Sequence, residues 1–184
     1  MKEPQQNQGR PDFKTSMNVA NALCTIHQRC IVVPFRNHWG KRALGLPCAL
    51  AFVLMFFWVG FSQDPLMLGW FVAWCLFYVV RRIEAGRLSG QVHSHDDGCP
   101  INLGKNERLA KRFFEPLLIG LLGGGLRWFY IEQGWSPVGL PNFLLAGVVS
   151  LIVVEAFKKQ IWERRIDDMN DARFEQESLL RDYQ

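Results

Sequence analysis

Apolar residues are concentrated in four blocks, and polar and charged residues fill the segments between them. Each block is followed or preceded by charge, yet the run from Ala51 to Phe61 lacks the polar stripe that a helix of a soluble bundle would show. The pattern therefore predicts an all-α polytopic membrane protein. The four predicted transmembrane helices cover residues 43–61, 66–82, 113–130 and 140–158.

The lengths of the blocks agree with this interpretation. A helix rises roughly 1.5 Å per residue, so the longer blocks come close to crossing a hydrocarbon core of about 30 Å. The second block is shorter, but Arg81 and Arg82 extend it because their aliphatic stems can lie in lipid while their charged heads reach the interface. We expect two helical hairpins joined by a loop at residues 83–112, all within a transmembrane domain at residues 38–160.

The distribution of Lys and Arg predicts the orientation. The segment before the first block, the middle loop and the start of the tail are basic, whereas the connections 62–65 and 131–139 contain neither residue type. Cytoplasmic loops carry an excess of Lys and Arg. Both termini and the middle loop are therefore expected in the cytoplasm.

An amphipathic helix is expected at about residues 17–33, within a cytoplasmic N-terminal segment at 1–37. Its apolar face has helical spacing and ends before Pro34. This face is formed by Val19, Leu23, Ile26, Cys30 and Val33. Two placements are open: the helix lies on an anionic membrane surface, or it packs on the cytoplasmic loop of the same chain.

The tail at residues 161–184 contains no Gly or Pro and is rich in helix formers, so it is expected to continue the fourth helix into the cytoplasm. Its apolar residues need a cover, either the N-terminal helix or a partner protein. These candidate interaction residues are Trp162, Ile166, Met169 and Phe174. The sequence from Trp162 to Ala172, with the His-Ser-His stretch at 93–95, resembles small bacterial four-span membrane proteins; the resemblance covers the second half of the chain and implies no activity.

The middle loop contains the residues best suited to bind a metal. His93 and His95 lie on one side of an extended segment, and Asp97 and Cys99 could complete a tetrahedral site for zinc or a similar ion. Asp-Asp-Gly followed by Cys-Pro is also ordinary turn chemistry, so a polar turn that shapes the loop is the alternative.

Charged residues within the blocks are candidates for function because charge is costly in a membrane. Glu115 and Glu155 are expected either to pair with bases on their own helices or to bind a cation or relay protons across facing helices. The bases one turn away are Lys111 and Arg112 for the first and Lys158 and Lys159 for the second.

Two further features concern the third helix. Arg127 is expected to reach the outer interface or to pair with Asp64 or Glu132. Gly120 and Gly124 have the GxxxG spacing that permits close helix packing, within the chain or in a homo-oligomer.

The motifs of the common enzyme classes are missing. The sequence shows no phosphate-binding glycine loop, HExxH, GxSxG or CxxC. We therefore expect a non-enzymatic scaffold or accessory subunit of a larger bacterial inner-membrane complex, for example one of secretion or conjugation type. The lipid bilayer and other subunits are its expected partners, with no nucleic acid and no cofactor. The alternative is a metal-responsive protein or a small ion or metal carrier.

Overall fold

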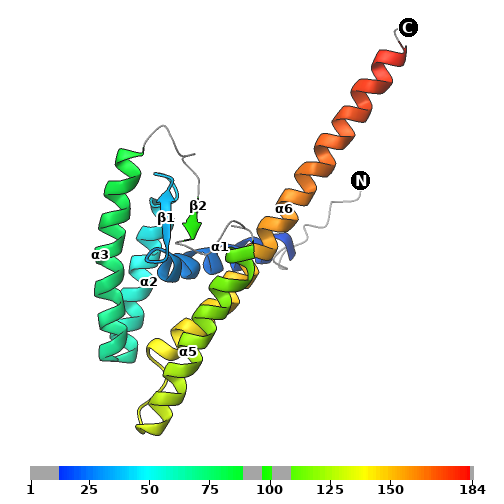
Figure 1. The fold of residues 1–184 in the computed structure, drawn as a ribbon. Helices are drawn as coiled ribbons and strands as arrows, with labels where there is room; N and C mark the ends of the chain where they lie inside the picture. Colours follow the sequence, from blue (N-terminus) through cyan, green and yellow to red (C-terminus); the bar gives the residue numbers. More distant parts are fainter. Residues whose placement is uncertain (1–12, 89–96, 101–108, 183–184) are drawn as a thin grey trace, which may run out of the picture.

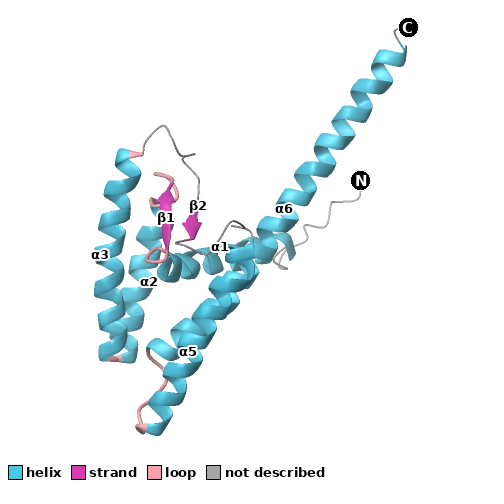
Figure 2. Cartoon of the chain, in the orientation of Figure 1, coloured by secondary structure: helices cyan, strands magenta, loops and turns pink. Residues whose placement is uncertain are grey.

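The computed structural model describes residues 13–88, 97–100 and 109–182, and this part of the chain is mostly helical (Figures 1 and 2). Helices α2 and α3 form one antiparallel hairpin and α5 and α6 form a second, as Figure 1 shows. The elements, in chain order, are α1 (Phe13–Val32), β1 (Arg36–Trp39), α2 (Leu46–Ser62), α3 (Pro65–Arg87), β2 (Asp97–Pro100), the π-helical turn η1 (Ala110–Phe114), α5 (Glu115–Glu132) and α6 (Leu140–Asp182).

Two of the described helices are long and apolar enough to cross a membrane, where the sequence pattern predicts four. They are α3 and the Leu140–Phe174 part of α6. Helix α2 is apolar but has 17 residues, about 26 Å at a rise of roughly 1.5 Å, which is short of a core of about 30 Å. Helix α5 has 18 residues but includes Glu115, Arg127 and Glu132.

Helix α1 lies across the two hairpins and packs against α2 and α6 (Figure 1). Its last turn is buried, and two indoles of α3 satisfy carbonyl groups at this end: Trp74 Nε1 donates to Arg29 O at 3.0 Å and Trp70 Nε1 to Cys30 O at 3.3 Å. The last four carbonyls of a helix have no intrahelical donor, so these bonds allow α1 to end inside the protein.

The apolar face predicted for this helix is divided between two environments. Cys30 and Val33 are buried against other helices of the chain, while Val19 and Leu23 are more than half exposed. The buried part therefore packs within the chain, and Arg29 of this last turn also contacts Asp97 in the segment that joins the two hairpins. Gly147 of α6 permits the approach, because a Cβ atom there would overlap Ile31 Cδ1.

Strands β1 and β2 form a two-stranded antiparallel sheet that the hydrophobic pattern did not predict. Arg36 pairs with Pro100 and Trp39 with Asp97. Gly98 has a φ of 73°, and a Cβ atom there would lie 2.9 Å from Asn37 O, so glycine is required at this position. The sheet brings Asp97 next to the end of α1.

Helix α6 is a single helix of 43 residues, so the tail continues the fourth apolar block without a break. Its C-terminal part, residues 159–182, projects beyond the other helices in Figure 1 and is called the arm below. The side chains described on the arm are mostly exposed.

Candidate functional site

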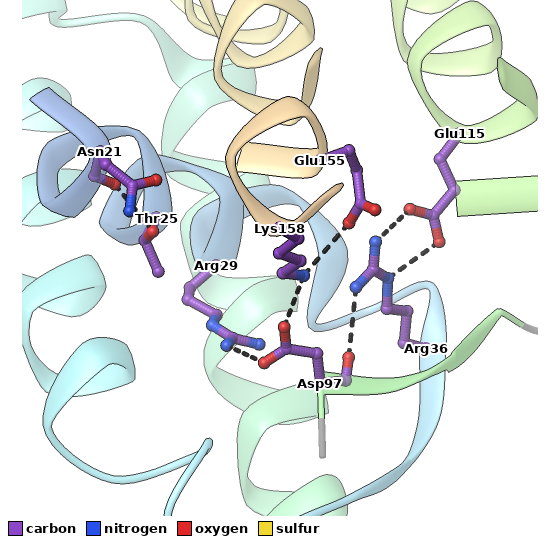
Figure 3. A network of polar contacts seen from close by, with 8 residues as sticks. All are labelled: Asn21, Thr25, Arg29, Arg36, Asp97, Glu115, Glu155 and Lys158. Carbon is purple, nitrogen blue, oxygen red and sulfur yellow. Dashed lines mark hydrogen bonds and ion pairs between the residues drawn. The ribbon is translucent and has the colours of Figure 1, made fainter. Parts of the chain in front are cut away.

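A cluster of charged side chains lies where α1, the small sheet, α5 and α6 meet (Figure 3). It contains three basic and three acidic residues that come from five segments of the chain. We call this cluster the ionic junction; its members are Arg29, Arg36, Asp97, Glu115, Glu155 and Lys158.

Arg36 and Glu115 form the most buried part of the ionic junction. Arg36 Nε donates to Glu115 Oε1 at 2.9 Å, Nη2 donates to Oε2 at 2.5 Å, and Nη1 donates to Asp97 O at 3.2 Å. Burial alone would lower the pKa of Arg36, but the hydrogen bonds and charge of Glu115 raise it, so the guanidinium stays charged. This is the two-point geometry in which a guanidinium binds a carboxylate most strongly.

The π-helical turn η1 explains how Glu115 reaches this position. Pro116 has no N–H group and would interrupt a regular helix, whereas the wider turn before it has the Glu115 N–H donating to Ala110 O, five residues back. The helix therefore passes the proline, and the Glu115 side chain is directed toward Arg36 (Figure 3).

Asp97 joins α1 to α6. Its Oδ1 accepts from Arg29 Nη2, and its Oδ2 lies 2.5 Å from Lys158 Nζ, which also lies 3.1 Å from Glu155 Oε1. Burial alone would raise the pKa of Asp97, but the charges of Arg29 and Lys158 outweigh it and hold this pKa well below its usual range. The Arg29 guanidinium also lies 4.8 Å from the ring centre of Trp39.

The structure describes two of the four residues predicted to bind a metal, Asp97 and Cys99. His93 and His95 lie outside the described residues. Both oxygens of Asp97 contact basic side chains, and Cys99 lies on β2. Within residues 13–88, 97–100 and 109–182, no three His, Cys, Asp or Glu residues are grouped in a way that could hold a metal ion.

The two glutamates of the apolar blocks both belong to the ionic junction. Glu155 pairs with Lys158 on its own helix, one of the two bases expected for it. Glu115 instead pairs with Arg36, which is 79 positions away in sequence, rather than with a base of the preceding turn. The physical reason is burial: Glu115 is 6% exposed, and a buried carboxylate needs a partner that can enter the same interior.

The other residues of the predicted site lie apart from the ionic junction. Arg127 donates to Asn142 Oδ1 at 2.6 Å, rather than to Asp64 or Glu132. A Cβ atom on Gly120 would lie 3.7 Å from Val148, whereas one on Gly124 would meet nothing within 4 Å in the described chain. Gly123 has the closer contact, at 3.2 Å from Leu144 and Leu145.

At the opposite ends of the hairpins, Asp64 makes a second connection that the sequence analysis missed. Its Oδ1 accepts from Leu66 N at 3.0 Å and from Tyr130 Oη at 2.8 Å, and its Oδ2 accepts from Leu140 N at 2.8 Å. An aspartate before a proline is a common helix cap. The cap is visible in the sequence, but its contacts with the second hairpin are not.

The arm carries the predicted interaction residues at its surface. Trp162, Met169 and Phe174 are at least half exposed, and Ile166 is about one third exposed. The ionic junction fixes the base of this helix, since Lys158 immediately precedes the arm. No protein-family model, curated protein or solved structure matches the chain.

Proposed function

We propose that this chain is a non-enzymatic scaffold or accessory subunit of a larger membrane complex, with the arm as its docking element. The observation that carries the proposal is the exposure of large apolar side chains on the arm, above all Met169 at 61% and Phe174 at 69%. Large apolar side chains on a projecting helix are typical of a surface that a partner covers. A bacterial inner membrane with both termini in the cytoplasm is the location we propose.

Exposed apolar surface on the hairpins supports the membrane placement. Only 11% of the apolar window of α3 is buried within the chain. The core helix of a soluble protein would be mostly buried, so α3 needs another apolar environment. Helices α2 and α5 also present large apolar side chains outward, including Phe57 and Leu121.

We further propose that α2 and α5 are membrane spans beside α3 and α6, which gives four. The charges of α5 do not oppose this placement, because Glu115 is neutralised by Arg36 and Arg127 is hydrogen-bonded to Asn142. Glu132 is the last residue of the helix, where an interface is expected. The short α2 needs only local thinning of the bilayer, which costs fractions of a kcal/mol per Å of mismatch.

The connections between the hairpins suit a scaffold. Helix α1 contacts both hairpins, the ionic junction ties it to α5 and α6, and Asp64 ties the far ends together. Because α6 is continuous from the membrane into the arm, the orientation of the arm is fixed by this bundle. We propose that its partner is a protein with an apolar groove or a second helix, in the way that amphipathic helices are generally bound.

The test is the state of the protein after mild detergent extraction from its native membrane. We expect the full chain to travel in a large particle with defined companion proteins. A chain that ends at Gln160 should still insert but should lose those companions, because it lacks all but the first two residues of the arm. An undisturbed complex would count decisively against the scaffold.

Point variants separate the apolar surface from the length of the arm. Met169→Ser with Phe174→Ser should release the companions while leaving insertion intact. The matched control is Asn170→Ser with Gln176→Ser, at exposed polar positions of the same segment. Loss of the companions with the control pair as well would show that the apolar surface is not the recognised feature.

A further inference from the structure

A hollow of about 480 Å³ lies between the last turns of α3 and strand β1. This volume is within the range of small-molecule sites, roughly 300–1,000 Å³. Three apolar and three polar residues of the described chain line it: Val80, Ile83, Leu88, His38, Glu84 and Arg87. The exposed surface of these lining residues is mostly apolar, and the hollow lies at the end of α3 where Arg81, Arg82 and Arg87 are found.

We propose that this hollow binds the headgroup of an anionic phospholipid, with the acyl chains along the exposed side of α3. The inference rests on the membrane placement of α3 proposed above. Basic pockets on the cytoplasmic side of transmembrane helices are a recurring solution for anionic headgroups.

The charges around the hollow favour an anion. Arg87 contributes a cation directly, and His38 contributes an imidazole. Arg82 Nη1 donates to Lys41 O at 2.9 Å, so the segment after β1 is held against α3, and both of these basic side chains are exposed.

The acidic residue among the described lining residues, Glu84, is already neutralised. Glu84 Oε2 lies 3.0 Å from Arg81 Nη1, and Oε1 accepts from the His38 N–H at 3.2 Å. With its charge balanced by Arg81, Glu84 does not cancel Arg87. Among the described residues, the lining that remains for a ligand is cationic at Arg87, polar at His38 and apolar at the other positions.

The apolar lining continues along the helix. Val79, Val80 and Ile83 are each more than half exposed, and the last two also line the hollow. An acyl chain lying on this side of α3 would cover them while its headgroup stays beside Arg87. A soluble phosphate could use the cation but would leave the apolar side chains uncovered, so a lipid is the better match.

The backbone of β1 holds His38 in an unusual conformation. Its φ is 56°, in the left-handed region that residues other than glycine rarely adopt. The neighbouring residues Asn37 and Trp39 are both paired with β2, and the His38 N–H donates to Glu84 Oε1. These three interactions hold the His38 backbone in this conformation. Such enforced strain is concentrated at ligand sites.

The test is native mass spectrometry of the full chain in detergent, titrated with phosphatidylglycerol, phosphatidylcholine or inorganic phosphate. We expect tighter binding of phosphatidylglycerol than of phosphatidylcholine, and no displacement by millimolar phosphate. Arg87→Gln should weaken phosphatidylglycerol binding about fivefold, the effect of roughly one Lys or Arg at an anionic surface. His38→Gln should weaken it too, whereas Arg87→Lys should retain it.

The matched control is Arg164→Gln, which removes the same charge from an exposed position on the arm. Equal binding of the two lipids, equal weakening by Arg164→Gln, or displacement by phosphate would overturn the proposal. Membrane insertion and the companion proteins are measured on the same variants. If Arg87→Gln leaves both intact and lipid selectivity is missing, this inference alone fails; if the chain does not enter membranes, the proposed function fails with it.

Discussion

Arg36 and Glu115 are 79 positions apart in sequence, yet they form a two-point ion pair that is almost completely shielded from solvent. Arg36 follows the end of α1, and Glu115 begins α5. The pair therefore connects the N-terminal segment to the second hairpin. Loss of one partner of this buried pair costs more free energy than loss of one partner of a surface ion pair, because the charge left alone in the interior would be poorly solvated.

Glu115→Gln should therefore destabilise the fold strongly. Removing one partner of a buried pair costs about 3–5 kcal/mol, since it leaves the other charge uncompensated. The measurement is the free energy of unfolding in detergent micelles. Glu163→Gln is the matched control, because Glu163 pairs with Lys159 at 3.4 Å on the exposed arm, where a pair contributes about 0–1 kcal/mol. Equal losses in the two variants would contradict the burial argument.

The double variant Arg36→Met with Glu115→Met provides a second measurement of the same pair. It removes both charges and leaves apolar side chains of similar volume, so it should cost less than Glu115→Gln alone. A double variant that is less stable than either single variant would contradict this expectation. It would show that the ion pair stabilises the fold more than apolar side chains do at the same two positions.

Asp97 predicts a dependence of stability on pH. Its pKa is lowered in the folded protein, so its contribution is complete above the ordinary carboxyl pKa of about 4 and is lost as the pH falls toward the lower folded value. The melting temperature of the parent should therefore fall as the pH is lowered below about 4. Asp97→Asn should have a lower melting temperature than the parent at neutral pH, and that temperature should depend less on pH in the acid range. The control Asp168→Asn, on the arm, should show the same pH dependence as the parent. Parallel profiles for the parent and Asp97→Asn would contradict this assignment.

Gly147 predicts the effect of a side chain between α1 and α6. A Cβ atom there would overlap Ile31 Cδ1, so Gly147→Ala should destabilise by about 1–3 kcal/mol, as overpacking generally does. Ile31→Val removes the overlapping carbon and should restore part of the loss, a non-additive result in a double-mutant cycle. Gly124→Ala is the control, because a Cβ atom there meets nothing within 4 Å of the described chain. A cost for Gly124→Ala equal to that for Gly147→Ala would place the sensitive contact elsewhere.

The elements with a strong local signal, such as a continuous apolar block, could be predicted from the sequence. The apolar blocks coincide with the helices of the two hairpins, and the lack of Gly and Pro after Phe157 predicted the continuous α6. The observed helix ends differ from the predicted ends by a few residues. Helix α3, for example, continues to Arg87, beyond the predicted end at residue 82. Polar residues such as Arg81 and Glu84 prolong it because their ion pair has helical spacing.

The contacts of the ionic junction could not be predicted in the same way. The local rule of charges one turn apart found the Glu155 partner but not the Glu115 partner, which depends on the path of the chain after α1. The small sheet has no hydrophobic alternation to reveal it, since β1 reads Arg-Asn-His-Trp. Its existence depends on tertiary pairing with β2, and such pairing leaves no periodic signal in a single sequence.

Asp64 predicts how the two hairpins are held together at the ends opposite the ionic junction. Its carboxylate accepts hydrogen bonds from Leu66 N, Tyr130 Oη and Leu140 N, so Asp64→Ala leaves donors of both hairpins without an acceptor, those of the second hairpin in buried positions. We expect a loss of about 1–3 kcal/mol in the free energy of unfolding, the cost of an unsatisfied buried polar group.

Asp64→Asn separates charge from geometry. The amide keeps one acceptor oxygen and can still cap α3, but it cannot accept at both positions, so its stability should lie between those of the parent and the alanine variant. Tyr130→Phe removes one donor and should cost less than Asp64→Ala. Measured in combination, Asp64→Ala and Tyr130→Phe should be less than additive, because the second change removes a donor that the first has already left unpaired. Full additivity would mean that the Asp64–Tyr130 hydrogen bond does not connect the hairpins in solution.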